Sequence, residues 1–415
     1  MTSTQPFHDV VIVGAGAAGI ATAASLLKRA PGLDVALIDP AGEHYYQPGW
    51  TLVGAGVFSQ ASTRRATAGL IPRGAHLIRA TVSGFAPELN QVLLEGLGPL
   101  GYRQLIVCPG LKLDWAAIDG LDASLGQHGV TSNYRYDLAP YTWELTRSLK
   151  QGQALFTQPG MPIKCAGAPQ KALYLACDYW RREGRQGQVK AAFLNANPSL
   201  FGVAAYVPAL QRYIERYQVD LCLSHRLIAV DGPRRQAVFE VKHAEGGVSH
   251  HTRSFDMLHV VPPQCAPDAL RGSALADAGG WLDVDPHSLR HRRFSNVHGV
   301  GDALNTGNAK TVAAARKQAP VVAHNVAAAL GRAQGSARYD GYGACPLTVE
   351  RGRIVLAEFA YGGQLAPSFP QWLLKGTEPT RLAWWLKANA LPWVYWQAML
   401  KGHEWLARPT LVEHP

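Results

Sequence analysis

The chain has 415 residues, of which 47% are hydrophobic and 17% charged, and its 40 Lys and Arg against 30 Asp and Glu give a net charge of +10. This places it among globular proteins long enough for two or three domains and a large core. The basic residues form no run that could follow a phosphate backbone, so nucleic acid is the least favoured anionic partner. The six cysteines include no CxxC pair, which excludes zinc and iron–sulfur spacings and predicts no metal site.

The chain begins with a predicted nucleotide-binding turn. An apolar strand at 10–13 runs directly into Gly14-Ala15-Gly16-Ala17-Ala18-Gly19, and a helix is predicted over 20–27. Gly14 permits the turn, Gly16 lets the backbone approach a pyrophosphate, and Gly19 allows helix and strand to pack closely. The phosphates would then meet the positive end of the helix. The spacing therefore predicts dinucleotide binding rather than a purely structural turn.

A second apolar strand, predicted at 35–38, ends at Asp39, whose carboxylate can accept hydrogen bonds from ribose hydroxyls. The uncharged stretch 10–27 is not expected to span a membrane, because it contains three glycines and a helix-breaking turn. It is not expected to be a signal peptide either, because nothing basic precedes it.

The next segments complete the first half of the chain. A turn-rich aromatic loop occupies 43–50, where ligands are often bound at the end of a parallel strand. The alternation over 76–94 predicts two strands of a hairpin or meander. A further strand at 104–110 carries Cys108, which is interpreted as a small buried hydrophobic residue.

A second strand–turn–helix–strand unit follows, with strands at 154–156 and 189–195 and a helix at 172–180. The loop between them, 158–171, lacks the glycine fingerprint, so a nicotinamide dinucleotide has no evident cradle there. Cys165 stands in this loop instead. The apolar run 256–263 is predicted as a closing strand of the same unit.

The strand predicted at 296–302 ends in an acid, and a helix is predicted from Thr311 to Leu330. Asp302 is therefore placed to bond the ribityl chain of a flavin, with a helix cap as the alternative interpretation.

The end of the chain differs in character, because six of its eleven tryptophans lie between Pro370 and His414 with basic residues among them. The run between Lys387 and Lys401 is too short to span a bilayer and contains Pro392. It predicts two short amphipathic helices lying in a membrane interface, and the alternatives are a dimer interface or an aromatic cap on the core.

Several long strings are similar to one family. With these motifs the chain resembles sulfide:quinone oxidoreductases, the mitochondrial-like type II branch in particular; they are His44-Tyr-Tyr-Gln-Pro-Gly-Trp-Thr-Leu-Val-Gly-Ala-Gly56, Lys164-Cys-Ala-Gly-Ala-Pro-Gln-Lys171, Met257-Leu-His-Val-Val-Pro-Pro263, Gly299-Val-Gly-Asp302, Tyr339-Asp-Gly-Tyr-Gly-Ala-Cys-Pro346 and Leu356-Ala-Glu-Phe359.

The resemblance implies an α/β fold with two Rossmann-like dinucleotide-binding domains, as in FAD/NAD-linked reductases, and a C-terminal amphipathic membrane-contact region. The expected parts are an FAD-binding domain over 1–150, a second domain with a degenerate NAD site over 151–265, a return to the first domain over 266–369, and the membrane and quinone region over 370–415.

The resemblance also implies a site. Cys165 and Cys345 match the catalytic redox pair, and no cysteine lies between Cys108 and Cys165, which favours non-covalent FAD. Carried over by position, the FAD contacts fall on Gly14, Gly16, Ala17, Ala18, Gly19, Asp39, Gln47, Val82, Asp302 and Lys310.

The implied reaction is oxidation of sulfide to sulfane sulfur, with two electrons passing through FAD to ubiquinone or another membrane quinone. We expect hydrosulfide to attack a bridge at Cys345 and free Cys165 as a thiolate, whose pKa Lys164 and Lys171 would lower. Glutathione or sulfite would accept the sulfur. Lys387 is expected at the mouth of the quinone pocket, with ring contacts from Trp393, Tyr395 and Trp396.

The expected location is the membrane surface, as a peripheral monotopic protein on the cytoplasmic face of a bacterial inner membrane, and a homo-oligomer is left open. Deleting the chain from Pro370 onward is expected to leave a soluble protein that sulfide still reduces.

Two rivals remain. A type II NADH:quinone oxidoreductase would carry a glycine fingerprint between Ala154 and Leu175, where none is present. A flavoprotein scaffold without turnover would hold Cys165 and Cys345 in separate places.

Overall fold

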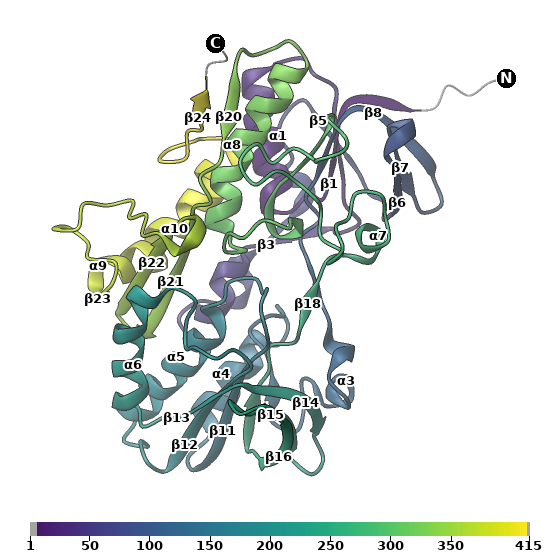
Figure 1. Ribbon diagram of the computed structural model, residues 1–415. Helices are drawn as coiled ribbons and strands as arrows, with labels where there is room; N and C mark the ends of the chain where they lie inside the picture. The colour runs from purple at the N-terminus through teal and green to yellow at the C-terminus, as the bar shows by residue number, and fades with distance from the viewer. Residues whose placement is uncertain (1–5, 413–415) are drawn as a thin grey trace.

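The structure, a computed structural model, describes residues 6–412 and is built on two sheets, the first mixed and the second parallel (Figure 1). The first sheet has the order β5-β2-β1-β8-β7-β6, and β19 also pairs with β8. Its strands are β1 (Phe7–Val13), β2 (Val35–Ile38), β5 (Ala75–Ile78), β6 (Val82–Ala86), β7 (Gln91–Leu94), β8 (Gly98–Val107) and β19 (Val297–Gly299). The nearly continuous apolar residues of β1, β2 and β8 are buried, as parallel strands covered on both faces require.

Two predictions for this half need comment. The helix after the glycine turn is confirmed as α1 (Ala17–Arg29), which packs against α8 (Val312–Ala329). The strand interpretation of 76–94 was wrong in part: β5 pairs in parallel with β2, and only β6 and β7 form an antiparallel hairpin. The pattern concealed this because residues 79–81, between β5 and β6, continue the apparent alternation without belonging to either strand.

The second sheet has the order β10-β17-β11-β12-β13 and confirms the second strand–turn–helix–strand unit. Its strands are β10 (Val130–Thr131), β11 (Gly152–Gln158), β12 (Val189–Asn195), β13 (Asp220–Leu223) and β17 (Met257–His259). Its helices are α4 (Ala139–Ser148), α5 (Ala168–Arg182) and α6 (Val207–Arg216). The start of α5 differs from the prediction by four residues, because Pro169 occupies the first turn, where its missing N–H is tolerated.

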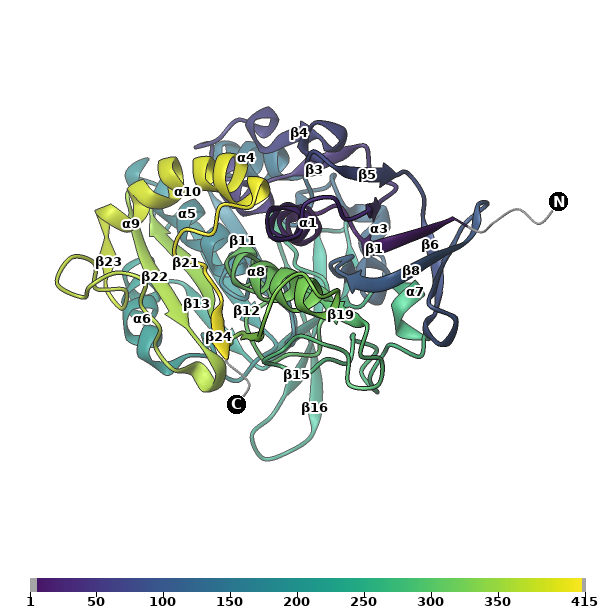
Figure 2. The same ribbon diagram turned by 90° about the horizontal axis from the view of Figure 1, so that it is seen from above.

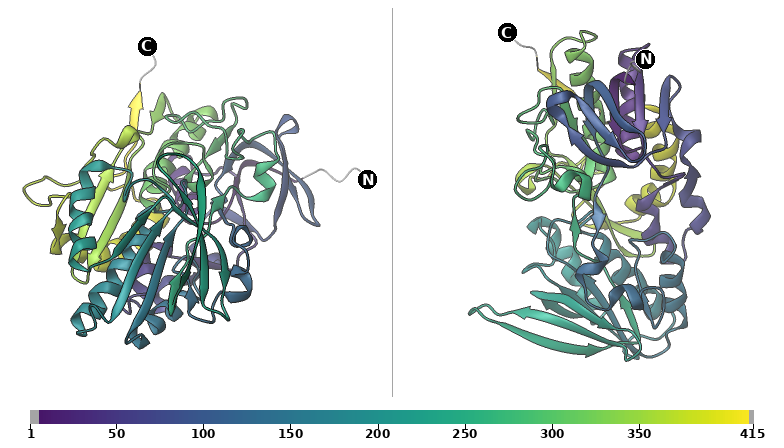
Figure 3. Two further views of the ribbon diagram at one scale, coloured as in Figure 1. Left: turned by 60° about the horizontal axis from the view of Figure 1, so that its bottom comes forward. Right: turned by 90° about the vertical axis from the view of Figure 1, so that its right-hand side faces the viewer.

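An antiparallel sheet of β14 (His225–Asp231), β15 (Gln236–Lys242) and β16 (Val248–Ser254) projects from the second half (Figures 2 and 3). The remaining short elements are α2 (Trp50–Val53), α3 (Leu121–Ser124), α7 (Asp268–Arg271), β3 (Glu43–Tyr45) with β4 (Arg64–Ala66), β9 (Lys112–Leu113) with β18 (Gln264–Cys265), and β20 (Ser336–Arg338) with β24 (Thr410–Val412). The domain boundaries stay predictions; β10, which lies before residue 150, already pairs with β17 of the second sheet.

The last part of the chain adds a hairpin and a bent helix. Strands β21 (Gly343–Glu350), β22 (Arg353–Phe359) and β23 (Pro379–Thr380) form an antiparallel sheet. The predicted pair of separate tail helices was wrong: residues 381–401 are helical throughout, from α9 (Arg381–Trp385) through α10 (Leu391–Trp393) to a last turn at Met399–Lys401. Two wide π-type turns, Leu386–Ala390 and Val394–Ala398, flank Pro392 and accommodate it without a break.

Candidate active site

The turn between β1 and α1 has the geometry that its glycines predict. Gly14 has a φ of +103°, and a Cβ there would lie 2.5 Å from the carbonyl oxygen of Cys108. A Cβ on Gly19 would overlap the carbonyl oxygen of Gly14, whereas a Cβ on Gly16 would meet nothing within 4 Å. Gly14 and Gly19 thus allow close backbone packing, and Gly16 borders open space. Cys108 is buried against Gly14, and burial raises its pKa, which confirms its interpretation as a buried apolar residue.

The same turn fits a dinucleotide. Asp39 is held at the end of β2, where its carboxylate oxygens accept from Ala15 N–H at 2.7 Å and Ala41 N–H at 2.8 Å. The first turn of α1 contains no acid, and no side chain caps it, so its N–H groups and dipole are available to an anion. Gly301 comes within van der Waals reach of Ala18, since a Cβ on it would lie 3.3 Å from the Ala18 Cβ. The segment carrying Asp302 therefore borders the turn.

Two substitutions separate the roles of these glycines. Gly16→Val should weaken FAD binding at least about tenfold, or ~1.4 kcal/mol, because its side chain would fill the open space, while the unfolding temperature of the apoprotein is unchanged. Gly19→Ala should lower the stability of the apoprotein by about 1–3 kcal/mol through overpacking. Flavin titration and thermal unfolding of both variants measure this. A Gly16→Val protein that binds FAD like the wild type would contradict this assignment.

A cavity of about 370 Å³ lies where the two sheets, the β21–β22 hairpin and the tail helix meet. Of the predicted site residues, its lining includes Gln47, Cys165, Asp302, Lys310, Lys387 and Tyr395, together with Lys171. The structure therefore brings together residues from four distant parts of the chain. Val82, in β6, and the tail residues Trp393 and Trp396 lie outside this lining.

Cys165 occupies the loop that leads into α5, in an unusual backbone conformation. Its φ is +49°, in the left-handed region that non-glycine residues seldom adopt. Its N–H donates to the Lys310 carbonyl at 2.8 Å. Its own carbonyl accepts from Ala168 N–H at 2.7 Å and from the Tyr134 hydroxyl at 3.3 Å. Such strain persists only where the surroundings hold it, and it gathers at functional sites.

Folding brings the two predicted cysteines together, because the thiols of Cys165 and Cys345 each shift the pKa of the other. Gly167 allows the approach of α5 to β21, because a Cβ there would overlap Leu347. Lys171, on the first turn of α5, donates from Nζ to the Cys165 Sγ at 3.1 Å. A flavoprotein scaffold without turnover was expected to hold Cys165 and Cys345 in separate places, and in the structure they lie together.

The two cysteines differ in acidity. The hydrogen bond from Cys345 and the charge of Lys171 hold the pKa of Cys165 well below its ordinary value, although burial opposes them. The same hydrogen bond, together with burial, raises the pKa of Cys345. Of the two thiols, Cys165 is the one poised as a thiolate, and it also lies near the N-terminus of a helix, as low-pKa cysteines often do.

Lys387 was predicted at the mouth of the pocket, and this was wrong. It is 3% exposed, and its Nζ donates to the Pro48 carbonyl at 3.3 Å. Burial, followed by the charge of Lys171, lowers its pKa to about 7. The prediction failed because the bent tail helix turns this side chain inward toward the cysteines rather than out to solvent.

Lys164 does not contact Cys165 through its ammonium group. Its Nζ donates to Gln47 Oε1 at 2.7 Å and lies 5.5 Å from the ring centroids of Trp50 and Tyr134. Burial lowers its pKa to about 8. Of the two lysines predicted to activate the thiol, Lys171 makes the direct contact.

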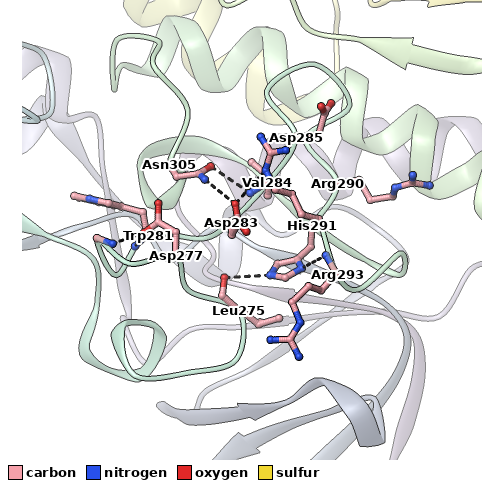
Figure 4. A network of polar contacts seen from close by, with 12 residues as sticks. Leu275, Asp277, Trp281, Asp283, Val284, Asp285, Arg290, His291, Arg293 and Asn305 are labelled. Carbon is pink, nitrogen blue, oxygen red and sulfur yellow. Dashed lines mark hydrogen bonds and ion pairs between the residues drawn. The ribbon is translucent and has the colours of Figure 1, made fainter.

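Asp302 and Lys310 lie next to the Cys165 loop. The Nζ of Lys310 donates to the carbonyls of Asp302 at 2.8 Å and Leu304 at 2.6 Å and lies 4.1 Å from the Trp281 ring centroid. Figure 4 shows how Trp281 and its neighbours are held: Asp277 accepts from the Trp281 N–H, and Asn305 donates to Asp283. Burial raises the pKa of Asp302, against the charges of Lys310 and Lys164. Thr311, and not Asp302, caps α8, so the cap interpretation of Asp302 was wrong.

The tail is partly a core element and partly exposed. The Tyr395 hydroxyl lies 2.6 Å from Nε2 of His44. The other ring nitrogen of His44, Nδ1, lies 3.2 Å from the Ala15 carbonyl oxygen. Trp396 is buried, and the Arg65 guanidinium lies 4.2 Å from its ring centroid. Farther on, Glu404 forms a bidentate ion pair with Arg29 of α1. Deleting the tail would open the core of the first sheet, so the expected soluble truncation does not follow.

Comparisons with known proteins decide the family. The mouse protein named mitochondrial sulfide:quinone oxidoreductase is 36% identical over 396 residues, which are 95% of this chain and 87% of that protein. The protein of the same name from Dictyostelium discoideum is 38% identical over 405 residues, which are 97% of this chain and 88% of that protein. This chain belongs to the sulfide:quinone oxidoreductase family. Membership makes it an oxidoreductase of the flavoprotein type, as the resemblance implied.

Solved structures agree on the fold. The X-ray structure of the sulfide:quinone oxidoreductase from Aquifex aeolicus matches with a TM-score of 0.77 and 16% identity, over 94% of this chain and 91% of that chain. A chain of the Tetrahymena thermophila mitochondrial ATP synthase structure gives 0.82 and 20% identity, over 97% and 98%. NDH2 from Plasmodium falciparum in complex with NADH, a solved example of the rival class, gives 0.56 and 13%, over 72% and 64%. A model of the lycopene cyclase protein family matches residues 9–56, the segment of the glycine turn and the loop after it.

Residues 6–412 contain no helix long and apolar enough to cross a membrane, and no group of three His, Cys, Asp or Glu that could hold a metal. Some cavity residues gave no signal in the sequence, because only the tertiary structure places them. They are Asn133, Tyr134 and Ser368, whereas Tyr342 and Glu358 stand in the family motifs but were given no role.

Proposed function

We propose that this protein oxidises sulfide to sulfane sulfur with the Cys165–Cys345 pair and passes two electrons through non-covalently bound FAD to a membrane quinone. The observation that carries the proposal is the close approach of the two thiols, with Lys171 donating to Cys165; Cys165 lines the cavity, and Cys345 does not belong to the lining. Sulfide and quinone are the substrates in the names of the relatives.

The acidities of the two thiols indicate a direction for the sulfur chemistry. In the oxidised pair, hydrosulfide attacks Cys345 Sγ, the bond between the cysteines breaks, and Cys165 leaves as a thiolate. A thiol of lower pKa leaves faster, and Lys171 stabilises that thiolate. Cys345 then carries a persulfide, whose outer sulfur passes to a thiol or sulfite acceptor and leaves both cysteines reduced.

A second cavity, of about 340 Å³, is lined by Ala166, which follows Cys165 in sequence, and by Phe359, on the strand that pairs with the Cys345 strand. It offers hydrosulfide and the acceptor room on that side. When bound, FAD takes up the two electrons released as the dithiol closes again to a disulfide. The residues proposed to hold it are the glycine turn, Asp39, Gln47, Val82, Asp302 and Lys310.

The other substrate would enter beside the tail. The cavity wall there consists mainly of apolar tail residues, including Leu386, Leu391 and Val394. A peripheral membrane contact is proposed because Trp372, Trp385, Trp393 and Trp405 are 85%, 55%, 54% and 53% exposed. Tryptophan is enriched at membrane interfaces, and exposed apolar side chains of this size mark interaction surfaces. The cytoplasmic membrane face and the oligomeric state stay predictions.

Removing three of these side chains tests the membrane contact. The triple variant Trp372→Ala, Trp393→Ala and Trp405→Ala should bind lipid vesicles at least about tenfold more weakly, since burying one large side chain contributes about 1.5–3 kcal/mol. Vesicle co-sedimentation of the holoenzyme measures it, with Trp281→Ala as the control for loss of a tryptophan outside the tail. Unchanged vesicle binding would favour an interface between copies of the chain.

The function is tested by anaerobic mixing of the yellow holoenzyme with sulfide and sulfite together and, separately, with NADH. Sulfide should remove the flavin absorbance within seconds, while NADH leaves it unchanged. Bleaching by NADH and not by sulfide would overturn the proposal in favour of the NADH:quinone oxidoreductase alternative.

A further inference from the structure

We propose that Ser368, Tyr342 and Glu358 form a proton path from solvent into the apolar half of the cavity, where Glu358 protonates the quinone as it is reduced. This inference rests on the proposed function and names residues for its second half. Reduction of a quinone to a quinol takes up two protons as well as two electrons, and these protons must be delivered by side chains that line the cavity.

The three side chains form a continuous chain of oxygen atoms. Ser368 is exposed, and its Oγ lies 3.1 Å from the Tyr342 hydroxyl. That hydroxyl donates to Glu358 Oε1 at 2.6 Å. Because the Tyr342 proton points to the carboxylate, Ser368 is left to donate to the Tyr342 oxygen. The hydrogen bonds therefore run in one direction, from the surface to Glu358.

Glu358 is the inner end of this chain. It is 4% exposed and lines the cavity, beside the apolar wall of Leu356, Phe369 and Leu386. Its backbone is fixed by Tyr206, whose hydroxyl donates to the Glu358 carbonyl at 2.9 Å and accepts from the Glu358 N–H at 3.0 Å. The Ser368 N–H donates to the other carboxylate oxygen at 3.2 Å. Burying an ionised carboxylate costs free energy, which these two hydrogen bonds offset in part, and no cation pairs with Glu358 among residues 6–412.

The β21–β22 hairpin separates this acid from the sulfur chemistry. Glu358 is the pairing partner of Ala344, while Cys345 pairs with Ala357. Since successive side chains of a strand point to opposite faces, Glu358 and Ala344 share the cavity face and Cys345 points away from it. Cys345 is correspondingly absent from the cavity lining, although both neighbours, Ala344 and Pro346, belong to it.

Two cations of α8 lie beside the path. Lys317, on α8, places its Nζ 5.2 Å from the Tyr342 ring centroid, and Arg316, on the same helix, lines the cavity. Burial, followed by the charge of Glu358, raises the pKa of Tyr342, so its hydroxyl keeps a proton to relay. From β22 and the loop after it, Glu358 and Ser368 are the polar groups that face the phenol.

The proposed step balances. The Glu358 carboxylate first takes up a proton that Ser368 and Tyr342 relay from water. Its new O–H bond then breaks as the proton forms an O–H bond with a quinone oxygen, and bound FAD, once reduced, would supply the two electrons. The carboxylate is then reprotonated through Tyr342 and Ser368 from water, and a second passage delivers the second proton.

The test separates the two halves of the reaction in the holoenzyme. After anaerobic reduction by sulfide, stopped-flow mixing with a water-soluble short-chain quinone records flavin reoxidation against pH and in heavy water. Glu358→Gln should slow reoxidation roughly 10²-fold, as expected for loss of a general acid, and should abolish its pH dependence. Tyr342→Phe should slow it less and delay proton uptake from a pH-indicator dye. Glu358→Asp should restore part of the rate.

The control is Glu350→Gln, which removes a carboxylate from the same hairpin and leaves the cavity untouched; its ion pairs are with Arg216 and Arg353. Reoxidation by Glu358→Gln with the rate, pH profile and isotope effect of the wild type would overturn the proton path. Slowed reoxidation with an unchanged pH profile and no delay in proton uptake would also overturn it, as a merely structural effect. If sulfide does not bleach even the wild type, the proposed function fails, which is a separate result.

Discussion

Replacing either cysteine of the pair should abolish reduction of the flavin by sulfide. Cys165→Ser removes the thiolate that leaves, and Cys345→Ser removes the sulfur that hydrosulfide attacks, so neither variant can form or reopen a bridge. The bleaching rate should fall by at least about 10³-fold, as is typical when one member of a group of catalytic residues that act together is removed. Anaerobic stopped-flow absorbance of the flavin measures it.

Controls make this result specific. A serine at either position is nearly isosteric, so flavin content and unfolding temperature should stay close to those of the wild type. Cys265→Ser, a partly exposed cysteine outside the cavity lining, should bleach at the normal rate. If both pair variants bleach at a near-normal rate, the cysteines have no redox role, and a flavoprotein with another sulfide site is the better account.

The second large effect is expected from Lys171→Met. The ammonium group lies 3.1 Å from Cys165 Sγ, and an opposite charge this near lowers a pKa by roughly 1–3 units. Its removal should raise the pKa of Cys165, so that the thiolate forms only at higher pH. Alkylation of Cys165 at neutral pH should slow by about tenfold or more. The pH at which the rate of sulfide-dependent bleaching begins to rise should be higher than in the wild type.

Peptide-resolved mass spectrometry of iodoacetamide labelling follows Cys165 apart from the other cysteines. Lys190→Met is the matched control, since Lys190 is exposed on β12 and lies outside the cavity lining. A Cys165 labelling profile in Lys171→Met that coincides with the wild type at every pH would show that another group holds the thiolate.

Much of this site follows from local patterns in the sequence. The glycine turn, the strand that ends at Asp39 and the loop that carries Cys165 each depend on residues close together in the chain, where strand and helix periodicities are informative. Lys171 was also predicted to lower the pKa of this thiol, as a positive charge close to Cys165 in the chain, although the predicted helix began only at residue 172. The structure confirms these contacts with small shifts in helix boundaries.

What could not be predicted depends on contacts between distant segments. Lys387 is buried because the tail helix bends back over the loop at Pro48, and no local pattern contains that bend. The face of β22 that carries Glu358 follows from its register with β21, which a shift of one residue would reverse. The tail tryptophans lie in one segment of similar composition, yet Trp396 packs in the core while Trp372 is 85% exposed.

The central claim is that hydrosulfide adds its sulfur to this pair of cysteines. Isotopically labelled sulfide, mixed anaerobically with the oxidised holoenzyme and quenched with an alkylating agent before any acceptor is added, allows every cysteine to be mapped by mass. The account predicts the labelled sulfur on Cys345 and an alkylated thiol at Cys165. Labelled sulfur on any other cysteine, or bleaching of the flavin with none on the pair, would contradict it.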